Sequence, residues 1–353
     1  MDDIELRRWI ESITPDHNRL SLSVRGIVEN LLKTEKIDYL AITSRVKDSE
    51  SIVNKVKRKT YTNAKSQLTD ISGIRIIVFF ESDIERVCSI IKTAFEIDTK
   101  NSSNKNSSLK SNQTGYRSVH FVCELGKKRS ELPENLGLDG FKFELQIRTV
   151  LQHAWAELAH DRNYKFTGKL PIDAERKLFL YAGMLELADR GLDELSRELD
   201  EYIVSSQAEV SAGDLESKID SINLVKFMED WSKTNNFPVE ELGNKSQYTE
   251  VIAELSSFGI STLKELNAII PKNYIEIANK HNYHSTINGV IRDWMLIHNW
   301  RHFAKAVKYD WGMSNEEIVA HFLPIEEIEE FNTAFPVESD EDDEDVELEL
   351  DQV

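Results

Sequence analysis

The first 200 residues alternate between stretches with helical spacing and stretches with strand-like spacing of apolar positions. Helical patterns fill residues 1–40, a cation-rich helix is predicted over residues 45–59, and another over residues 83–95. Runs rich in β-branched residues predict strands at about residues 74–80, 118–124 and 142–148. This order of elements predicts an α/β (α+β) domain built around a short mixed sheet and flanked by helices.

The second part of the chain has only helical patterns. A polar segment at residues 99–114 predicts a flexible loop, and a long helix is predicted over residues 173–202. After a predicted break at residues 205–213, amphipathic patterns follow at residues 224–231, 248–258 and 287–307. Residues 258–266 resemble the start of a helix-hairpin-helix unit with Ser261 as its helix cap.

These patterns predict three parts: an α/β domain with N-terminal helices over residues 1–204, an acidic helical domain over residues 205–336, and a tail over residues 337–353. Residues 201–353 contain 31 acidic residues against 11 lysines and arginines, and the tail contains 10 acids and no base. Self-repulsion predicts a disordered tail that solubilises the chain or, alternatively, mimics nucleic acid. The acidic domain favours regulation by a protein partner or self-association over nucleic-acid binding.

Composition predicts the compartment. The two cysteines, Cys88 and Cys123, are too few for a disulfide framework or a thiolate metal site. No apolar run approaches the roughly 20 residues that cross a bilayer. We therefore expect a soluble, cytoplasmic protein without a membrane partner.

Two acids stand at comparable ends of predicted strands. Asp70 precedes the first strand, and Glu144 opens the strand that runs directly into a helix containing His153, Glu157 and His160. Carboxylates on neighbouring strands of one sheet hold Mg²⁺ in many phosphoryl-transfer folds, because this cation prefers hard oxygen ligands. The alternative for either acid is a solvated carboxylate at a strand end.

Two further stretches contain groups that suit a nucleotide. Lys47, Lys55 and Arg58 are spaced by nearly whole helical turns, so on one helix they would share a face and converge on a triphosphate. In GYRSVH, residues 115–120, Tyr116 would present a flat face to a purine, while Arg117 or His120 would reach phosphate oxygens. The alternatives are a solvated helix face and an ordinary junction between loop and strand.

Taken in order, the stretches SRVKDSESIVNKVKRK, DISGIRIIV, GYRSVH and FELQIRT with HAWAELAHD resemble the synthetase domain of the RelA/SpoT family, which makes guanosine tetra- and pentaphosphate alarmones. The resemblance spans about residues 40–200 and implies a mixed sheet of the nucleotidyltransferase type. Only some 40 residues precede it, with the single histidine His17, so we expect no hydrolase module. The chain resembles the small, single-function alarmone synthetases.

The resemblance implies a GTP diphosphokinase of the stringent response, which transfers the β,γ-pyrophosphate of ATP to the 3′-hydroxyl of GDP or GTP and releases AMP. It implies that Arg45 and Arg75 sandwich the adenine, that Asp70 binds Mg²⁺, and that Glu144 assists the metal or accepts the 3′-hydroxyl proton. The remaining implied contacts are those of Lys47, Lys55 and Arg58 with the ATP phosphates, of Tyr116 with the guanine, of His153 with the base, and of Gln146, Arg117 and His120 with the acceptor phosphates or ribose.

One departure concerns the acceptor. Relatives often place a lysine four residues ahead of the tyrosine of GYRS, where this chain has Asn112. The nearest cation is Lys110, which would reach the acceptor phosphates from the predicted flexible loop. The choice between GDP and GTP therefore stays open.

Two other functions are consistent with the same residues. Toxic members of this family pyrophosphorylate the 3′ end of tRNA, and here the acidic domain would then neutralise the enzyme or sense a phage protein. In that case the cluster at residues 127–129 would contact the RNA backbone instead of forming a hairpin tip. A non-catalytic nucleotide sensor is the third class, and it would be expected to lack at least one metal ligand, whereas Asp70 and Glu144 are both present.

Overall fold

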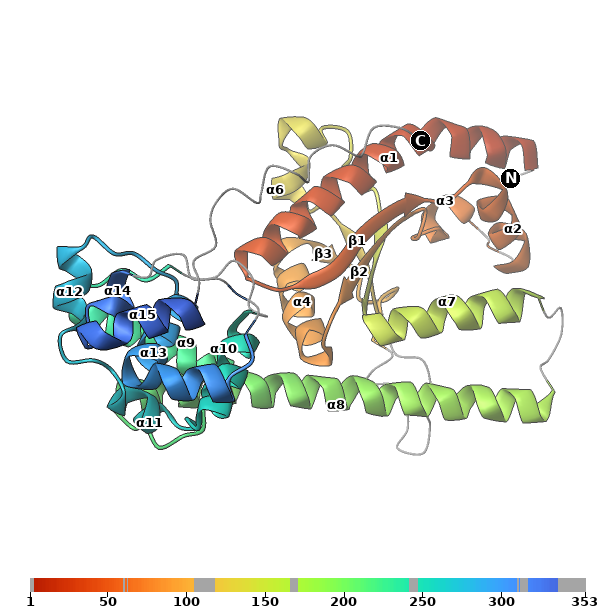
Figure 1. Ribbon diagram of the computed structural model, residues 1–353. Helices are drawn as coiled ribbons and strands as arrows, with labels where there is room; N and C mark the ends of the chain where they lie inside the picture. Colours follow the sequence, from red (N-terminus) through yellow and green to blue (C-terminus); the bar gives the residue numbers. More distant parts are fainter. Residues whose placement is uncertain are drawn as a thin grey trace, which may run out of the picture. The chain divides into compact units, whose positions relative to one another are not determined.

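The computed structural model describes residues 3–59, 61, 63–104, 118–165, 171–240, 247–309, 311 and 317–335, with their side chains except at 104, 159–165, 247 and 317. The chain divides into two compact units, Met1–Glu198 and Leu199–Val353. The first contains a sheet and the second is helical (Figure 1). The tail predicted at residues 337–353 lies outside the described residues.

A mixed sheet forms the centre of the first unit, which confirms the predicted fold class. Its strands are β1 (Tyr39–Val46), β2 (Ser72–Val78), β3 (Glu96–Ile97), β4 (Ser103–Asn104), β5 (Val119–Glu124) and β6 (Phe143–Thr149). The order across the sheet is β1-β2-β6-β5-β3, and β4 pairs with β5. β2 and β6 run parallel, whereas the other pairs are antiparallel. The N-terminal ends of β2 and β6 therefore meet at one edge of the sheet.

One face of this sheet is apolar and packs against α1 (Asp3–Thr34) and α4 (Glu81–Ala94). Apolar side chains recur at every second position along the strands and about once per helical turn along α1, as burial of a single face requires. The buried residues of this core include Ile74, Ile76 and Val78 on β2, Phe143, Leu145 and Ile147 on β6, and Leu20, Val24, Val28 and Leu32 on α1. The opposite face is left for polar side chains.

The remaining helices of the first unit surround these layers. They are α2 (Ser49–Lys59), α3 (Ala64–Gln67), α6 (Lys127–Ser130), the 3₁₀ turn η1 (Pro133–Asn135), α7 (Val150–Lys165) and the first part of α8 (Ile172–Ser211). The predicted cation-rich helix was wrong at its start, because β1 extends through Arg45 and the helix begins only at Ser49. β1 is an edge strand with polar residues at alternate positions, so its sequence lacks a buried apolar run.

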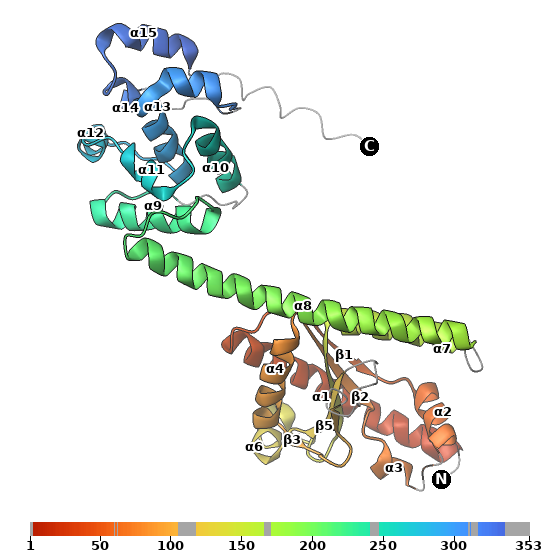
Figure 2. The ribbon, with the colours of Figure 1, turned by 90° about the horizontal axis from the view of Figure 1, so that it is seen from below.

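Two further predictions differ from the structure. The break predicted at residues 205–213 is wrong, because α8 continues to Ser211 as one helix (Figure 2) and ends near Gly213, whose φ of 83° suits a glycine. The cationic cluster predicted as a hairpin tip is the short helix α6, where Arg129 donates to the Ala94 carbonyl (3.0 Å). Among the described helices, none is long and apolar enough to cross a membrane.

The junction of β6 and α7 is fixed by Thr149. Its hydroxyl oxygen accepts a hydrogen bond from the Gln152 backbone amide (3.1 Å), and the Gln152 side chain accepts one from the Thr149 amide (3.3 Å). This reciprocal pair is a capping box, which satisfies two amides at the start of a helix. The same hydroxyl donates to the buried carboxylate of Asp189 on α8 (2.6 Å). One side chain thus joins the strand that carries Glu144 to two helices.

Replacing Thr149 by valine is expected to destabilise the first unit by about 2 kcal/mol or more, because the helix cap is lost and Asp189 loses a buried partner. Urea denaturation followed by circular dichroism measures this loss. Thr149→Ser keeps the hydroxyl and is the matched control, which should stay within about 1 kcal/mol of the natural protein. Equal destabilisation by serine and valine would contradict the role of the hydroxyl.

In its described residues the second unit is helical, as predicted, apart from two isolated β-bridges, Lys218 with Thr262 and Glu240 with Thr286. Its helices are the end of α8, α9 (Ser221–Asn235), α10 (Gln247–Phe258), α11 (Leu263–Ala268), α12 (Tyr274–Lys280), α13 (Ile287–Ala306), α14 (Glu317–Ala320) and α15 (Ile325–Ala334). Trp294, Tyr274 and Phe303 are fully buried in its core. The cap of α11 is Thr262 in a capping box with Glu265, so the prediction of Ser261 was wrong by one residue.

A buried acid lies within this helical core. Asp293 accepts hydrogen bonds at Oδ2 from the hydroxyls of Tyr274 (2.6 Å) and Tyr283 (2.8 Å). Burial raises the pKa of Asp293 to about 7, although the two hydroxyl hydrogen bonds lower it in part. In the unfolded chain the carboxyl has an ordinary pKa of about 3.9. The protonated acid therefore contributes stability that is complete below that value and is lost as the pH rises through about 7.

Asp293→Asn is expected to remove this pH dependence. Across pH 5 to 7 the free energy of unfolding of the natural protein should fall relative to the variant, with a slope of at most about 1.4 kcal/mol per pH unit. Thermal unfolding followed by tryptophan fluorescence at several pH values measures the difference, because Trp294 lies in the same core. A constant difference between the two proteins over this range would contradict the prediction.

Candidate active site

A polar cavity of about 210 Å³ opens on the face of the sheet opposite α1 and α4. The strand register explains its composition: Arg45 pairs with Gly73, Gly73 with Glu144, and Arg75 with Gln146, so these residues line one face. The full lining is Thr43, Ser44, Arg45, Lys47, Asp70, Gly73, Ile74, Arg75, Glu144, Gln146 and Glu157. Both predicted acids and several predicted cations therefore lie around one cavity.

Asp70 lies just before β2 and is held by two lysines. The Nζ atoms of Lys47 and Lys55 both donate to Asp70 Oδ2. Burial raises the pKa of Asp70, but the two lysine hydrogen bonds and charges outweigh it, so the pKa lies below its ordinary value. Lys47 lies between β1 and α2 and not on the helix, so the prediction that it shares a helix with Lys55 was wrong. Their convergence on a triphosphate stays a prediction.

Glu144 is the centre of a hydrogen-bonded row along β5 and β6. Its Oε1 contacts His120 Nδ1 (2.8 Å), and its Oε2 accepts from Gln146 Nε2 (3.0 Å). Gln146 Oε1 in turn accepts from Arg148 Nη2 (2.9 Å), and His120 Nε2 contacts Ser118 Oγ (2.7 Å). Burial raises the pKa of Glu144, but the hydrogen bonds from His120 and Gln146 outweigh this effect. The pKa therefore lies below its ordinary value, and the acid is ionised at neutral pH.

The third group on this face links the sheet to α7. Arg75 Nη1 donates to Glu157 Oε1 (2.9 Å), and His153 Nδ1 lies 3.7 Å from the same oxygen. Burial and the charge of Arg75 lower the pKa of His153, while Glu157 raises it in part. Because Glu157 is exposed and lines the cavity, α7 supplies an anionic group next to the guanidinium of Arg75.

The predicted site residues fall into three groups. Arg45, Lys47, Asp70, Arg75, Glu144 and Gln146 line the cavity, and Lys55, His120 and His153 contact or adjoin its acids. Arg58 is exposed on α2 and is not among the lining residues. Lys110, Tyr116 and Arg117 lie outside the described residues. Ser118 and the pairing of Glu157 with Arg75 were not predicted, because partners across strands and helices leave no spacing signal in the sequence.

The acids of the cavity fit a hard divalent cation. Among the described residues, none donates a hydrogen bond to the buried Asp70 Oδ1, whereas Oδ2 holds both lysines. Within the described part of the chain, no group of three or more His, Cys, Asp or Glu side chains gathers as a metal cage. Two carboxylates and an open cavity suit a cation such as Mg²⁺, which takes most of its ligands from water and phosphate.

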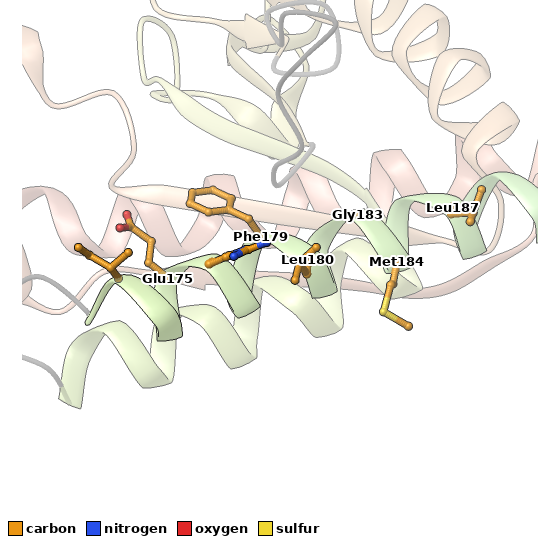
Figure 3. A pocket seen from close by; sticks show the side chains of 8 residues that line it. Glu175, Phe179, Leu180, Gly183, Met184 and Leu187 are labelled. Carbon is orange, nitrogen blue, oxygen red and sulfur yellow. The ribbon is translucent and has the colours of Figure 1, made fainter.

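A second hollow, of about 710 Å³, lies along the first part of α8 (Figure 3). It is lined mainly by exposed apolar side chains, among them Phe179, Leu180, Met184 and Leu187, with Glu175 and Arg176 as charged groups. A triphosphate needs several converging cations or backbone amides. The smaller polar cavity, with its lysines, arginines and paired acids, is therefore the candidate active site.

A mixed sheet with cations and paired carboxylates on one face defines an α/β protein with a site suited to phosphate groups. The family model described as "Region found in RelA / SpoT proteins" matches residues 44–169. GTP pyrophosphokinase YwaC of Bacillus subtilis is 34% identical over 163 residues, which cover 44% of this chain and 73% of that protein. The chain belongs to the RelA/SpoT family.

Two further similarities each cover more than half of the chain. GTP pyrophosphokinase YjbM of B. subtilis is 27% identical over 205 residues, which cover 57% of this chain and 93% of that protein. The crystal structure of small alarmone synthetase 1 from B. subtilis aligns with 23% identity and a TM-score of 0.46, over 55% of this chain and 98% of that chain.

Proposed function

We propose that this protein is a GTP diphosphokinase that transfers the β,γ-pyrophosphate of ATP to the 3′-hydroxyl of GDP or GTP. The observation that supports this best is the cavity in which Asp70 and Glu144 lie among Lys47, Arg45 and Arg75. The family membership and the relatives named GTP pyrophosphokinase agree with it. Those names also favour a guanosine nucleotide over tRNA as the acceptor.

In this proposal the cations of the cavity bind the donor nucleotide. Lys47 and Lys55 leave Asp70 and turn to the phosphates of ATP, and Arg45 and Arg75 flank the adenine with their planar guanidinium groups. Glu157 holds the Arg75 guanidinium in place, since the two are already paired at 2.9 Å. The donor is thereby oriented before transfer, which is how enzymes of phosphoryl transfer obtain much of their acceleration.

Asp70 and Glu144 would hold Mg²⁺, whose chemistry here is to neutralise the oxygens of the transferred group. The buried Asp70 Oδ1, which has no hydrogen-bond partner among the described residues, supports Asp70 as a ligand. Glu144, which is held at both oxygens, would accept the proton of the 3′-hydroxyl. Gln146 and His153 would contact the acceptor nucleotide. Self-association and a protein regulator that binds the second unit stay predictions.

One labelling experiment tests this proposal. Full-length protein is incubated with ATP labelled in its γ-phosphate and, side by side, with GDP, GTP and deacylated tRNA. The expected result is label on the 3′ position of the guanosine nucleotides with release of AMP. Label that reaches only tRNA, or release of ADP in place of AMP, would contradict the proposal.

A further inference from the structure

Both ring nitrogens of His120 are engaged within the protein. Nδ1 lies 2.8 Å from Glu144 Oε1, and Nε2 lies 2.7 Å from Ser118 Oγ. The ring itself is mostly buried, with 18% of its side chain exposed. In this arrangement neither nitrogen is left to bind a phosphate or ribose of the acceptor, which is the role that the sequence suggested for His120.

The partners of the ring determine where its proton lies. A carboxylate oxygen can only accept a hydrogen bond, so at 2.8 Å from Oε1 the Nδ1 atom carries hydrogen and donates. The hydroxyl of Ser118 is then the donor that suits a neutral Nε2. Ser118 is fully buried, so bulk water does not supply a hydrogen-bond partner for its hydroxyl. A buried serine thus favours the tautomer of His120 that donates to Glu144.

The second oxygen of Glu144 is held from the other side. Gln146 Nε2 donates to Oε2 at 3.0 Å, and Arg148 Nη2 fixes the Gln146 carbonyl at 2.9 Å. The strand register accounts for this, because His120 on β5 pairs directly with Gln146 on β6. With one donor on each oxygen, the plane of the carboxylate is fixed while its remaining lone pairs are available to the cavity that Glu144 lines.

We propose that His120 is a positioning residue, which together with Ser118 and Gln146 fixes the carboxylate of Glu144 toward the acceptor hydroxyl. This inference rests on the proposed function. His120 does not take the proton from Glu144, because Nδ1 already carries hydrogen and Nε2 faces the buried Ser118. The proton removed from the 3′-hydroxyl stays on Glu144 until water or product carries it away.

Steady-state kinetics with ATP and GDP separate positioning from substrate binding. His120→Phe is expected to lower kcat by about 10- to 100-fold, because a misplaced base loses its alignment, with the KM for GDP changed by less than about threefold. His120→Asn places an amide N–H close to the position of Nδ1 and should restore most of kcat. A raised KM for GDP with unchanged kcat in His120→Phe would overturn the proposal.

A double-mutant cycle shows whether His120 acts through Glu144. In a Glu144→Gln background, His120→Phe should lower the residual kcat by less than about twofold, because the base that it positions is already absent. If His120 bound the acceptor directly, His120→Phe would lower kcat by the same factor in the natural protein and in the Glu144→Gln variant. Equal factors would therefore overturn the proposal. Circular dichroism of each variant verifies that the fold is retained.

A readout that does not depend on activity distinguishes this inference from the proposed function. Nitrogen-15 NMR of labelled imidazoles, assigned with His120→Phe, is expected to show a proton on Nδ1 of His120 in the natural protein. Ser118→Ala should shift the ring toward a mixture of tautomers. An unprotonated Nδ1 would overturn the inference even in an active enzyme. If Nδ1 is protonated but no guanosine nucleotide is labelled, the proposed function fails while the geometry of Glu144 stands.

Discussion

Glu144→Gln is expected to lower kcat for pyrophosphate transfer to GDP by about 10²- to 10⁴-fold, the range that removal of a general base usually costs. Glutamine preserves the length and shape of the side chain, so it fits between His120 and Gln146. It cannot accept a proton. Its amide nitrogen is a hydrogen-bond donor, so it faces a donor of either His120 or Gln146 where the carboxylate had an acceptor. The loss should therefore appear in kcat and much less in the KM for either nucleotide.

The control for this substitution is Glu124→Gln on the neighbouring strand β5. Glu124 is partly exposed, does not line the cavity and lies 3.9 Å from Lys142 as its ion-pair contact. Its replacement should change kcat by less than about twofold. Substantial activity of Glu144→Gln with normal metal dependence would show that another group accepts the proton and that Glu144 is not the base.

Asp70→Asn is expected to lower kcat by at least about 10²-fold in Mg²⁺, and at the same time to tighten the binding of metal-free nucleotide. Both effects have one cause, since Asp70 holds Lys47 and Lys55 through Oδ2, while its buried Oδ1 has no hydrogen-bond partner in the part of the chain that the structure describes. Under the proposed function, the neutral amide removes a cation ligand and also frees two ammonium groups for phosphate. A nucleotide that binds the natural protein would then have to displace these ion pairs.

Calorimetry with a non-hydrolysable ATP analogue measures the second effect directly. In EDTA the variant should bind the analogue about tenfold more tightly than the natural protein, which corresponds to ~1.4 kcal/mol. In excess Mg²⁺ this advantage should disappear, because the carboxylate of Asp70 in the natural protein would then bind the cation of the Mg²⁺–nucleotide complex and the amide of the variant would not. Weaker binding in both conditions would mean that Asp70 supports the fold of the site and neither competes with phosphate nor holds the cation.

The sequence predicted the sheet and both acids because these features have local signals. The β-branched run after Asp70 and the strand that opens at Glu144 are visible in isolation, and the structure places the two strands side by side as parallel neighbours. β1 was missed because an edge strand with Thr43 and Arg45 on its open face has the composition of a polar segment. The position of Lys47 was therefore assigned to the wrong kind of element.

The partners within the site could not be predicted for a different reason. The contacts of Ser118 with His120, of His120 with Glu144 and of Glu157 with Arg75 depend on strand register and on the placement of α7. Register is a property of pairing between distant segments, and a shift of one residue would turn each side chain to the other face. The sequence therefore identifies the groups, whereas only the fold determines which of them bond.

The continuous course of α8 changes how the two units can be separated in experiments. Its Asp189 accepts a hydrogen bond from Thr149 in the first unit, and its Val210 is buried in the core of the second. A protein shortened at residue 204, the end of the first domain predicted from the sequence, would keep Asp189 but remove the last two turns of this helix. Truncations that are meant to test regulation should therefore retain Ser211. Activity that is lost because α8 was cut is then not mistaken for lost regulation.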